Sequence, residues 1–212
     1  MIPPRMVERL VAYRRHLRRW LADGKPRIYS HELAGLAQVT SAVVRRDVMT
    51  IGYTGSPAKG YAAAGLVDRI GRVLDPPQRP GVALVGLGSL GRAVLKHFAR
   101  LHPELRFVAA FDVSPEKVGR IIDGCRCHGS ADLETVLRAD PALVGIIAVP
   151  GEAAQDVADR LVRAGVRGIL NLAPVRLQTP PTVYVEDVDL AVSLEKVVFF
   201  ARPETERLEA LA

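Results

Sequence analysis

A short glycine-rich segment constrains the fold of this chain more than any other feature. Residues 82–85 are uniformly apolar, as in a buried parallel strand, and Gly86, Gly88 and Gly91 follow at G-x-G-x-x-G spacing. Helical periodicity begins directly after Gly91. A strand that enters such a loop and leaves it as a helix is typical of the phosphate-binding turn of a doubly wound sheet. We therefore expect an α/β domain of the Rossmann type.

Each glycine of this loop has its own physical role. Gly86 permits the tight turn, Gly88 lets the backbone approach a pyrophosphate, and Gly91 lets the helix pack closely on the strand. The first N–H groups of the helix and the positive end of its dipole favour phosphate. The loop residues expected at the cofactor are Gly86, Leu87, Gly88, Ser89, Leu90 and Gly91.

A carboxylate closes the next predicted strand. That strand covers residues 107–111, and Asp112 follows it, 21 residues beyond Gly91. An acid at this place accepts hydrogen bonds from the adenosine ribose hydroxyls and repels a 2′-phosphate. The sequence therefore favours NADH and NAD⁺ over their 2′-phosphorylated forms. A Rossmann-like domain that holds another nucleotide, such as coenzyme A, or none is the alternative.

Strands and helices alternate along the rest of this half. The predicted strands are 144–149, 168–171 and 183–185, and the predicted helices are 153–164 and 194–211, the last interrupted near Pro203. Val149 and Pro150 end a strand on the side where ligands bind in such sheets, so we expect them at the cofactor. The run 197–200 is too apolar to face water and belongs in a core or an interface.

A proline-rich segment separates this half from a basic N-terminal region. Three prolines lie within residues 74–80, and neither a helix nor a central strand should cross them. We place the boundary at 75–80, giving domains 1–78 and 79–212. Residues 1–80 hold 14 Lys and Arg against 6 Asp and Glu, a net charge of +8 in a chain whose total is +6. Such a region is typical of polyanion binding, and a solvated Arg-rich helix face is the alternative.

The N-terminal domain has the pattern of a winged helix. Helices are predicted over 4–22, 32–37 and 42–51, with Gly24 ending the first, Ser30 capping the second and Thr40 or Ser41 capping the third. The predicted apolar stripe of the first helix is Val7, Leu10, Val11, Leu17, Trp20 and Leu21. The last two helices have helix-turn-helix spacing. Gly52, Gly55 and Gly60 punctuate a loop that fits a β-hairpin wing.

The third helix has the character of a DNA-recognition helix. Val44 and Val48 are four residues apart and face the core, which leaves Arg45, Arg46 and Met49 pointing outward. A recognition helix presents such residues to base edges and phosphates in the major groove. The expected DNA contacts are Ser41, Arg45, Arg46, Met49 and Thr50 on the helix, Lys59 and Tyr61 in the wing, and phosphate contacts from Arg14, Arg15, Arg18 and Arg19.

The residues that catalysis would require are missing from the pattern. No Ser/His/Asp set is apparent, and too little chain remains beyond the sheet for a substrate domain. Cys125, Cys127 and His128 form Cys-x-Cys-His without a nearby fourth ligand, so we expect no metal and no disulfide framework. We therefore expect that this protein is not an enzyme. A small NAD- or coenzyme-A-binding enzyme with an N-terminal helical dimerisation domain is the alternative.

The composition predicts a folded protein, and the N-terminus predicts a cytoplasmic one. With 49% hydrophobic and 25% charged residues, disorder over most of its length is not expected. No run of about 18 uncharged apolar residues exists, which predicts no membrane span. The N-terminus lacks the apolar core of a signal peptide, so we expect a cytoplasmic protein.

Taken together, the sequence resembles the Rex family of redox-sensing transcriptional repressors over nearly its whole length. The most specific stretches are 38–40 with 44–47, 86–91, 111–119, 149–155, 168–175 and 185–190. The resemblance implies a homodimer on a pseudo-palindromic operator, with the C-terminal helix swapped onto the partner. It implies that NADH releases the protein from DNA, whereas NAD⁺ does so poorly.

The resemblance also assigns roles to individual positions. Arg15 and Asp189 match residues that exchange partners between the two states, and Leu190 lies at the nicotinamide end of the cofactor. His97 stands where the family usually has an aromatic hydroxyl that partners this Asp. Further departures are the end of the recognition helix, which lacks an aromatic pair, and the wing, which lacks the usual Arg-Gly.

Overall fold

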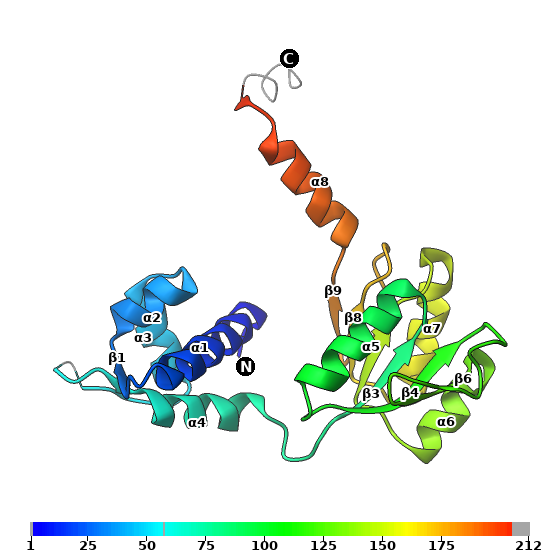
Figure 1. Cartoon of the computed structure of the whole chain (residues 1–212), viewed down its shortest axis with the longest axis horizontal. Coiled ribbons are helices and arrows are strands. Elements are labelled where there is room, and N and C mark those ends of the chain that lie inside the picture. Colours follow the sequence, from blue (N-terminus) through cyan, green and yellow to red (C-terminus); the bar gives the residue numbers. More distant parts are fainter. Residues whose placement is uncertain (1, 57, 205–212) are drawn as a thin grey trace. The chain divides into compact units, whose positions relative to one another are not determined.

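The computed structural model divides the chain into two compact units, Met1–Pro77 and Gln78–Ala212 (Figure 1). It describes residues 2–56 and 58–204. The predicted α/β class is confirmed, and the second unit carries the large sheet. Each unit is described separately.

The first unit is built from helices and one short ladder. Its helices are α1 (Pro4–Ala22), α2 (Ser30–Ala37), α3 (Ser41–Thr50) and α4 (Ala63–Leu74), and its strands are β1 (Arg27–Ile28) and β2 (Tyr61–Ala62). The two strands pair antiparallel, with Ile28 opposite Tyr61. The fourth helix is not predicted from the sequence. It lies along α1 and contributes the buried residues Leu66 and Ile70 to the core.

The buried face of α1 differs from the predicted stripe. Its buried residues are Met6, Leu10, Tyr13 and Leu17, which follow the helical repeat. Val7 and Val11 are exposed, so their place in the predicted stripe is wrong. The buried face is rotated toward Met6 and Tyr13, because Tyr13 fills the core and bonds a buried carboxylate on α3.

Two further local predictions need correction. Ser30 is the first residue of α2 rather than its cap, because Tyr29 precedes the helix and its N–H donates to Glu32 Oε2 (2.7 Å). Thr40 caps α3, its Oγ1 accepting from the Val43 N–H (3.3 Å). The predicted hairpin wing is shorter than a two-stranded ladder, because the described residues of that loop form one antiparallel bridge, between Ser56 and Gly60. Strand β2 pairs with β1, which precedes α2.

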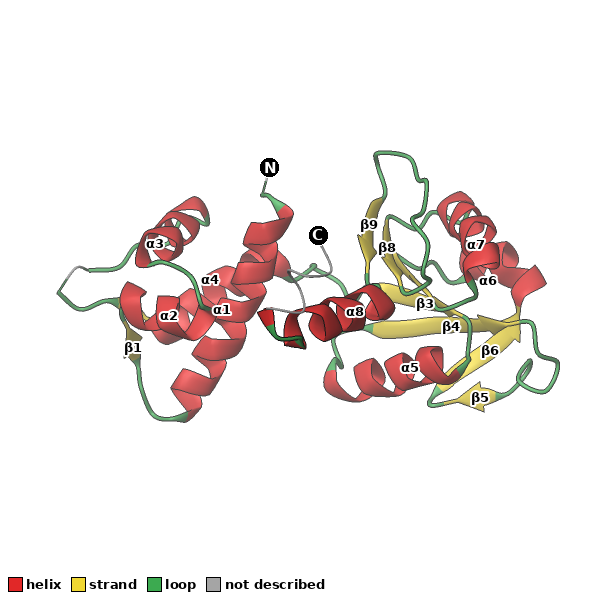
Figure 2. Cartoon of the chain, turned by 90° about the horizontal axis from the view of Figure 1, so that it is seen from above, coloured by secondary structure: helices red, strands yellow, loops and turns green. Residues whose placement is uncertain are grey.

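The second unit is a sheet of seven strands covered by helices on both faces (Figure 2). The strands are β3 (Gly81–Val85), β4 (Arg106–Asp112), β5 (Ile121–Ile122), β6 (Cys125–Gly129), β7 (Val144–Ile147), β8 (Gly168–Asn171) and β9 (Tyr184–Asp187), in the order β5-β6-β4-β3-β7-β8-β9. Only the β5–β6 pair is antiparallel. Helix α5 (Ser89–Leu101) packs on one face, and α6 (Leu133–Ala139) with α7 (Gly151–Arg163) packs on the other.

The two cysteines lie on a strand of this sheet. Cys125 and Cys127 are two residues apart on β6, and both are buried on the α5 face of the sheet. Burial raises the pKa of the Cys125 thiol to about 11. Within the described residues, no group of three or more His, Cys, Asp or Glu is arranged to hold a metal ion. Both side chains belong to the hydrophobic core on this face of the sheet.

The C-terminal helix α8 spans Leu190–Ala201. It begins four residues before the predicted start, and residues 205–211 of the predicted range lie outside the described residues. None of its side chains is buried, and Leu194, Val197 and Phe200 are each about two-thirds exposed. No helix within the described ranges is long and apolar enough to span a membrane.

Candidate functional site

The glycine loop joins β3 to α5 at the carboxyl edge of the sheet. Gly86 has a φ of 96°, and a Cβ there would clash with the carbonyl of Ala148. A Cβ on Gly91 would clash with the Gly86 carbonyl. Gly88 differs, because a Cβ there would meet nothing within 4 Å. The chain's own packing thus explains Gly86 and Gly91, whereas a glycine at position 88 serves to leave the outer surface of the loop open.

The amide groups at the start of the helix that follows this loop are available to a ligand. Gly88 precedes α5, and no side chain caps the helix. The first N–H groups of an α-helix have no intrahelical acceptor, and the dipole makes this end positive. The open surface at Gly88 therefore lies beside donors that suit a pyrophosphate.

Asp112 ends β4 beside this loop and is 7% exposed. Its Oδ2 accepts from the Leu87 N–H (2.8 Å) and from Lys117 Nζ (3.0 Å), and its Oδ1 accepts from the Ser114 N–H (2.8 Å). Burial by itself would raise the pKa of Asp112, but the hydrogen bonds from Ser114, Lys117 and Leu87 hold it below its ordinary value. The group is therefore a fixed carboxylate at neutral pH.

The remaining predicted cofactor residues are only partly brought together. Val149 lies beside the loop, because its Cγ1 would be 3.1 Å from a Cβ placed on Gly86. Pro150 precedes α7 on the same edge of the sheet. Leu190 opens α8 and is 57% exposed, and no described contact joins it to the loop.

The recognition-helix candidate α3 has the polarity that its sequence predicts. Val44 and Val48 are buried, Arg45 and Arg46 are exposed, and Met49 is 71% exposed. Thr50 is also exposed, and its Oγ1 donates to the Arg46 carbonyl (2.8 Å). Ser41 begins the helix, Lys59 is exposed in the following loop, and Tyr61 is largely buried on β2.

A buried carboxylate ties α3 to α1. Asp47 is 3% exposed and accepts from Arg9 Nε (2.6 Å), Arg9 Nη2 (2.8 Å) and the Tyr13 hydroxyl (3.0 Å). Burial, together with the nearby Asp47 carboxylate, raises the pKa of Tyr13, so its hydroxyl stays a donor. The pairing fixes the orientation of α3, and with it the direction in which Arg45 and Arg46 point.

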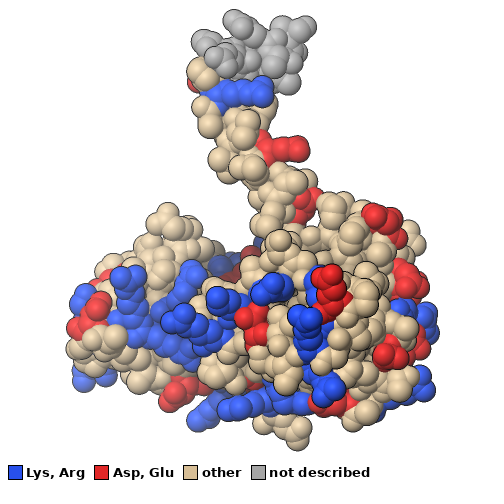
Figure 3. All heavy atoms as spheres, turned by 45° about the vertical axis from the view of Figure 1, so that its right-hand side comes forward, with Lys and Arg blue, Asp and Glu red and all other residues tan. Residues whose placement is uncertain are grey.

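Basic side chains gather on the first unit in the view of Figure 3. Arg15, Arg18 and Arg19 on α1 are exposed. Arg14 is different, because it is half-buried and pairs with Asp75. The side chains of three of the four predicted phosphate contacts on α1 therefore make no hydrogen bond within the described part of the chain.

The three predicted switch residues lie on three different elements. Arg15 is exposed on α1, and His97 is exposed on α5 with its ring edge-on to Phe98 (5.4 Å). Asp189 caps α8, its Oδ1 accepting from the Val192 N–H (2.9 Å). Within the second unit, no hydrogen bond among the described residues joins His97 to Asp189.

Sequence reasoning does not find two features of these sites. Lys117 forms an ion pair with Asp112. The sequence signal for this pair is the position of Lys117, five residues after Asp112 in the segment that follows β4. The N-terminus of α2 and Arg45 line one pocket. No local pattern indicates this pocket, because it depends on tertiary packing.

Comparisons with known proteins agree with this division of the chain. Residues 1–48 match the family model described as "Putative DNA-binding protein N-terminus", and residues 78–175 match the model described as "CoA binding domain". The chain is 35% identical to the redox-sensing transcriptional repressor Rex 1 of Enterococcus faecalis, covering 99% of this chain and 97% of the relative. It is 37% identical to the Rex repressor of Lactobacillus acidophilus, covering 97% of each.

Solved structures give the same result over the full chain. A crystal structure of RSP in complex with β-NAD⁺ and operator DNA matches with a TM-score of 0.91 at 28% identity, covering 100% of this chain and 97% of that one. RSP in complex with β-NADH matches with a TM-score of 0.84 at the same identity, covering 100% of this chain and 99% of that one.

The fold and the two sites define a class of protein in which a helix-turn-helix unit is joined to a nucleotide-binding Rossmann unit. The full-length relatives make the assignment specific. The chain belongs to the Rex family of redox-sensing transcriptional repressors, which is a family of regulators and not of enzymes.

Proposed function

We propose that this protein represses transcription by binding operator DNA through its first unit, and that NADH bound to its second unit releases it. One observation carries the proposal: a single chain joins outward-facing arginines on a helix-turn-helix to an open glycine loop beside a buried, hydrogen-bonded Asp112. A repressor of this kind acts on the chromosome, so we also propose a cytoplasmic location.

The second unit supplies the cofactor contacts. The loop 86–91 and the start of α5 hold the pyrophosphate, and Asp112 accepts from the adenosine ribose. Val149, Pro150 and Leu190 serve the nicotinamide end. When bound, the cofactor supplies a nicotinamide ring whose charge differs between NADH and NAD⁺. The residues at the adenosine end contact a part common to both, so discrimination depends on the nicotinamide end.

The first unit supplies the DNA contacts. Arg45, Arg46 and Met49, with Ser41 and Thr50, lie along α3, and Lys59 and Tyr61 flank it from the loop and β2. The exposed arginines of α1 add charge that attracts phosphates.

The active form is a homodimer on a pseudo-palindromic operator. Helix α8 supports this proposal, because twelve residues rich in Leu, Val and Phe have no buried side chain in the single chain. A second copy that receives α8 removes this apolar surface from water. Arg15, His97 and Asp189 are the candidates for contacts that change between the DNA-bound and released states.

The test begins with an operator selected by binding from random duplexes. The complex is titrated at one fixed salt concentration with NADH, NAD⁺ or coenzyme A while fluorescence anisotropy reports DNA release. NADH is expected to dissociate the complex, NAD⁺ to do so much less well, and coenzyme A not at all. A complex that NADH leaves intact at saturation, or that NAD⁺ dissociates equally well, contradicts the proposal.

A further inference from the structure

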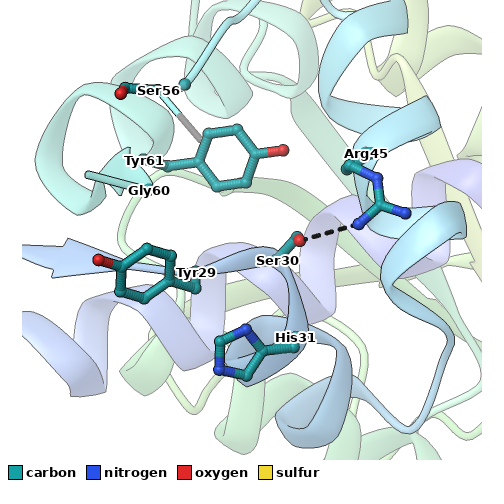
Figure 4. Close-up of a pocket in the computed structure, with 8 residues that line it drawn as sticks. Tyr29, Ser30, His31, Arg45, Ser56, Gly60 and Tyr61 are labelled. Atoms are coloured by element: carbon teal, nitrogen blue, oxygen red, sulfur yellow. Dashed lines mark hydrogen bonds between the residues drawn. The ribbon is translucent and has the colours of Figure 1, made fainter. Parts of the chain in front are cut away.

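A pocket of about 370 Å³ lies within the first unit, between the start of α2, helix α3 and the loop that precedes β2 (Figure 4). Its lining includes Ser30 from α2, Arg45 from α3 and Tyr61 from β2, and no acidic side chain lines it. The nearby Glu32 is already held by the Tyr29 N–H. The lining therefore carries the positive charge of Arg45 and several groups that can donate hydrogen bonds, with no carboxylate beside them.

Tyr61 is a largely buried side chain whose hydroxyl faces this pocket. The residue is 9% exposed and is fixed by pairing with Ile28 in the ladder. Its ring also packs against Gly55, where a Cβ would clash with it. Figure 4 shows its hydroxyl directed toward the side of the pocket that holds Ser30 and Arg45. Within the described residues this hydroxyl has no hydrogen-bond partner, and a buried O–H without an acceptor is unfavourable.

Ser30 and Arg45 place further donors around the same space. Arg45 Nη1 donates to Ser30 Oγ (3.2 Å), which leaves the serine proton and most guanidinium N–H groups available. Ser30 is also the first residue of the eight-residue helix α2, whose first N–H groups have no intrahelical acceptor. Burial raises the pKa of Tyr61 despite the nearby Arg45, so this group too remains a donor.

We propose that this pocket binds one phosphate group of the DNA backbone, with Tyr61, Ser30 and Arg45 as its hydrogen-bond donors. The inference rests on the proposed DNA-binding function and refines it. A phosphate carries negative charge and offers acceptors only, which matches the charged Arg45 and the hydroxyl and N–H donors of this pocket, whereas a base edge is uncharged. Arg45 thereby positions the protein on the backbone, and Arg46 and Met49 are left to face the bases.

The test pairs a protein variant with a change in the DNA. Operator duplexes each carry one neutral methylphosphonate, moved step by step across a half-site, and affinity is measured for wild type, Tyr61→Phe and Ser30→Ala. In wild type, one position is expected to cost about 10-fold or more in affinity, the scale of a hydrogen bond to a charged group. Either variant is expected to bind the unmodified operator more weakly than wild type does. A methylphosphonate at that position is then expected to cost the variant much less affinity than it costs wild type.

Tyr53→Phe is the matched control. Its ring lies 6.3 Å from that of Tyr61, but its hydroxyl already donates to the Ala62 carbonyl (3.1 Å). This variant is expected to keep the wild-type methylphosphonate profile. Thermal unfolding of all three variants shows whether each is folded.

The outcomes separate this inference from the proposed function. Wild type that binds no selected duplex overturns the proposed function and the inference with it. Wild type that binds an operator while both variants retain every methylphosphonate penalty overturns the inference alone. Inorganic phosphate is also titrated into free protein and followed by NMR. If phosphate binding depends on Tyr61 while Tyr61→Phe leaves every methylphosphonate penalty unchanged, the pocket is a site for free anions. That result also overturns the assignment to DNA.

Discussion

Asp112 is held in place by the fold and still has capacity for a ligand. Three donors from the protein surround its carboxylate, yet a carboxylate has about four lone-pair sites and retains capacity for a ribose hydroxyl. We expect Asp112→Ala to weaken NADH binding by roughly 1.5–3 kcal/mol, the scale of a charge-assisted hydrogen bond. Calorimetry measures this directly. Asp156→Ala, an exposed acid on α7, is the control, and equal affinities for the two variants rule out the ribose role.

The depressed pKa of Asp112 has a consequence for stability. Since the folded-state pKa lies below that of the unfolded chain, the contribution of this group is fully present above the ordinary carboxyl pKa. It is lost as the pH falls through the folded-state value. Urea unfolding of wild type and Asp112→Asn across this acid range is expected to give a difference in free energy that shrinks with falling pH. A constant difference contradicts the account.

Asp47 sets the orientation of the recognition-helix candidate. Asp47→Asn keeps the shape but weakens the bonds from Arg9 and Tyr13, and we expect a loss of about 1.5–3 kcal/mol in unfolding free energy, the value for hydrogen bonds to a charged group. Glu8→Gln changes the net charge equally at an exposed site and should stay within about 0.5 kcal/mol of wild type. Equal stability of both variants means that the buried network does not hold α3.

At the scale of elements, α8 carries apolar surface that only another chain is expected to cover. Leu194 and Val198 are four residues apart on one face of it, and 64% and 50% exposed. We expect Leu194→Glu with Val198→Glu to convert the dimer to monomer in analytical ultracentrifugation. Glu195→Gln with Lys196→Gln, on the same helix, should leave it dimeric. A double-Glu variant that stays dimeric excludes α8 from the interface.

Sequence periodicity predicts some of these elements well and others not at all. Helix α1 has the predicted ends, because proline opens it and Gly24 adopts a φ of 75° beyond it. Helix α4 is not predicted, since its start at residues 63–65 reads as a continuation of the glycine-punctuated loop. Strand β6 has the alternation of a half-buried strand, with Arg126 between two buried cysteines, but its residue types resemble a metal motif.

The residues of the candidate sites also divide into those that the sequence predicts and those that it does not. The loop and Asp112 follow from spacing along the chain, because a strand, a tight turn and a helix fix their relation locally. Tyr61 and Ser30 are 31 residues apart and meet only through the β1–β2 ladder, so their shared pocket is a tertiary feature.

At the scale of the whole molecule, charge separates the two units. The net charge of +8 in residues 1–80 is doubled in a dimer. If about 6–10 phosphates are contacted, operator affinity is expected to fall by about 10³–10⁵ between 50 and 200 mM salt. Anisotropy titrations across this range give the slope. A nearly flat dependence contradicts binding through phosphates.

We expect one equilibrium to link the cofactor site to the DNA site. To move a dimer from about 99% DNA-competent to about 1%, NADH must favour the released form by roughly 10⁴ in total, about 100-fold at each of two sites. Linkage requires that operator DNA weaken NADH binding by the same total factor. The most direct test is NADH fluorescence titration of the dimer, free and saturated with operator, at one salt concentration. NADH is expected to bind the operator complex markedly more weakly than the free dimer, and an NADH affinity that operator DNA leaves unchanged contradicts this linkage.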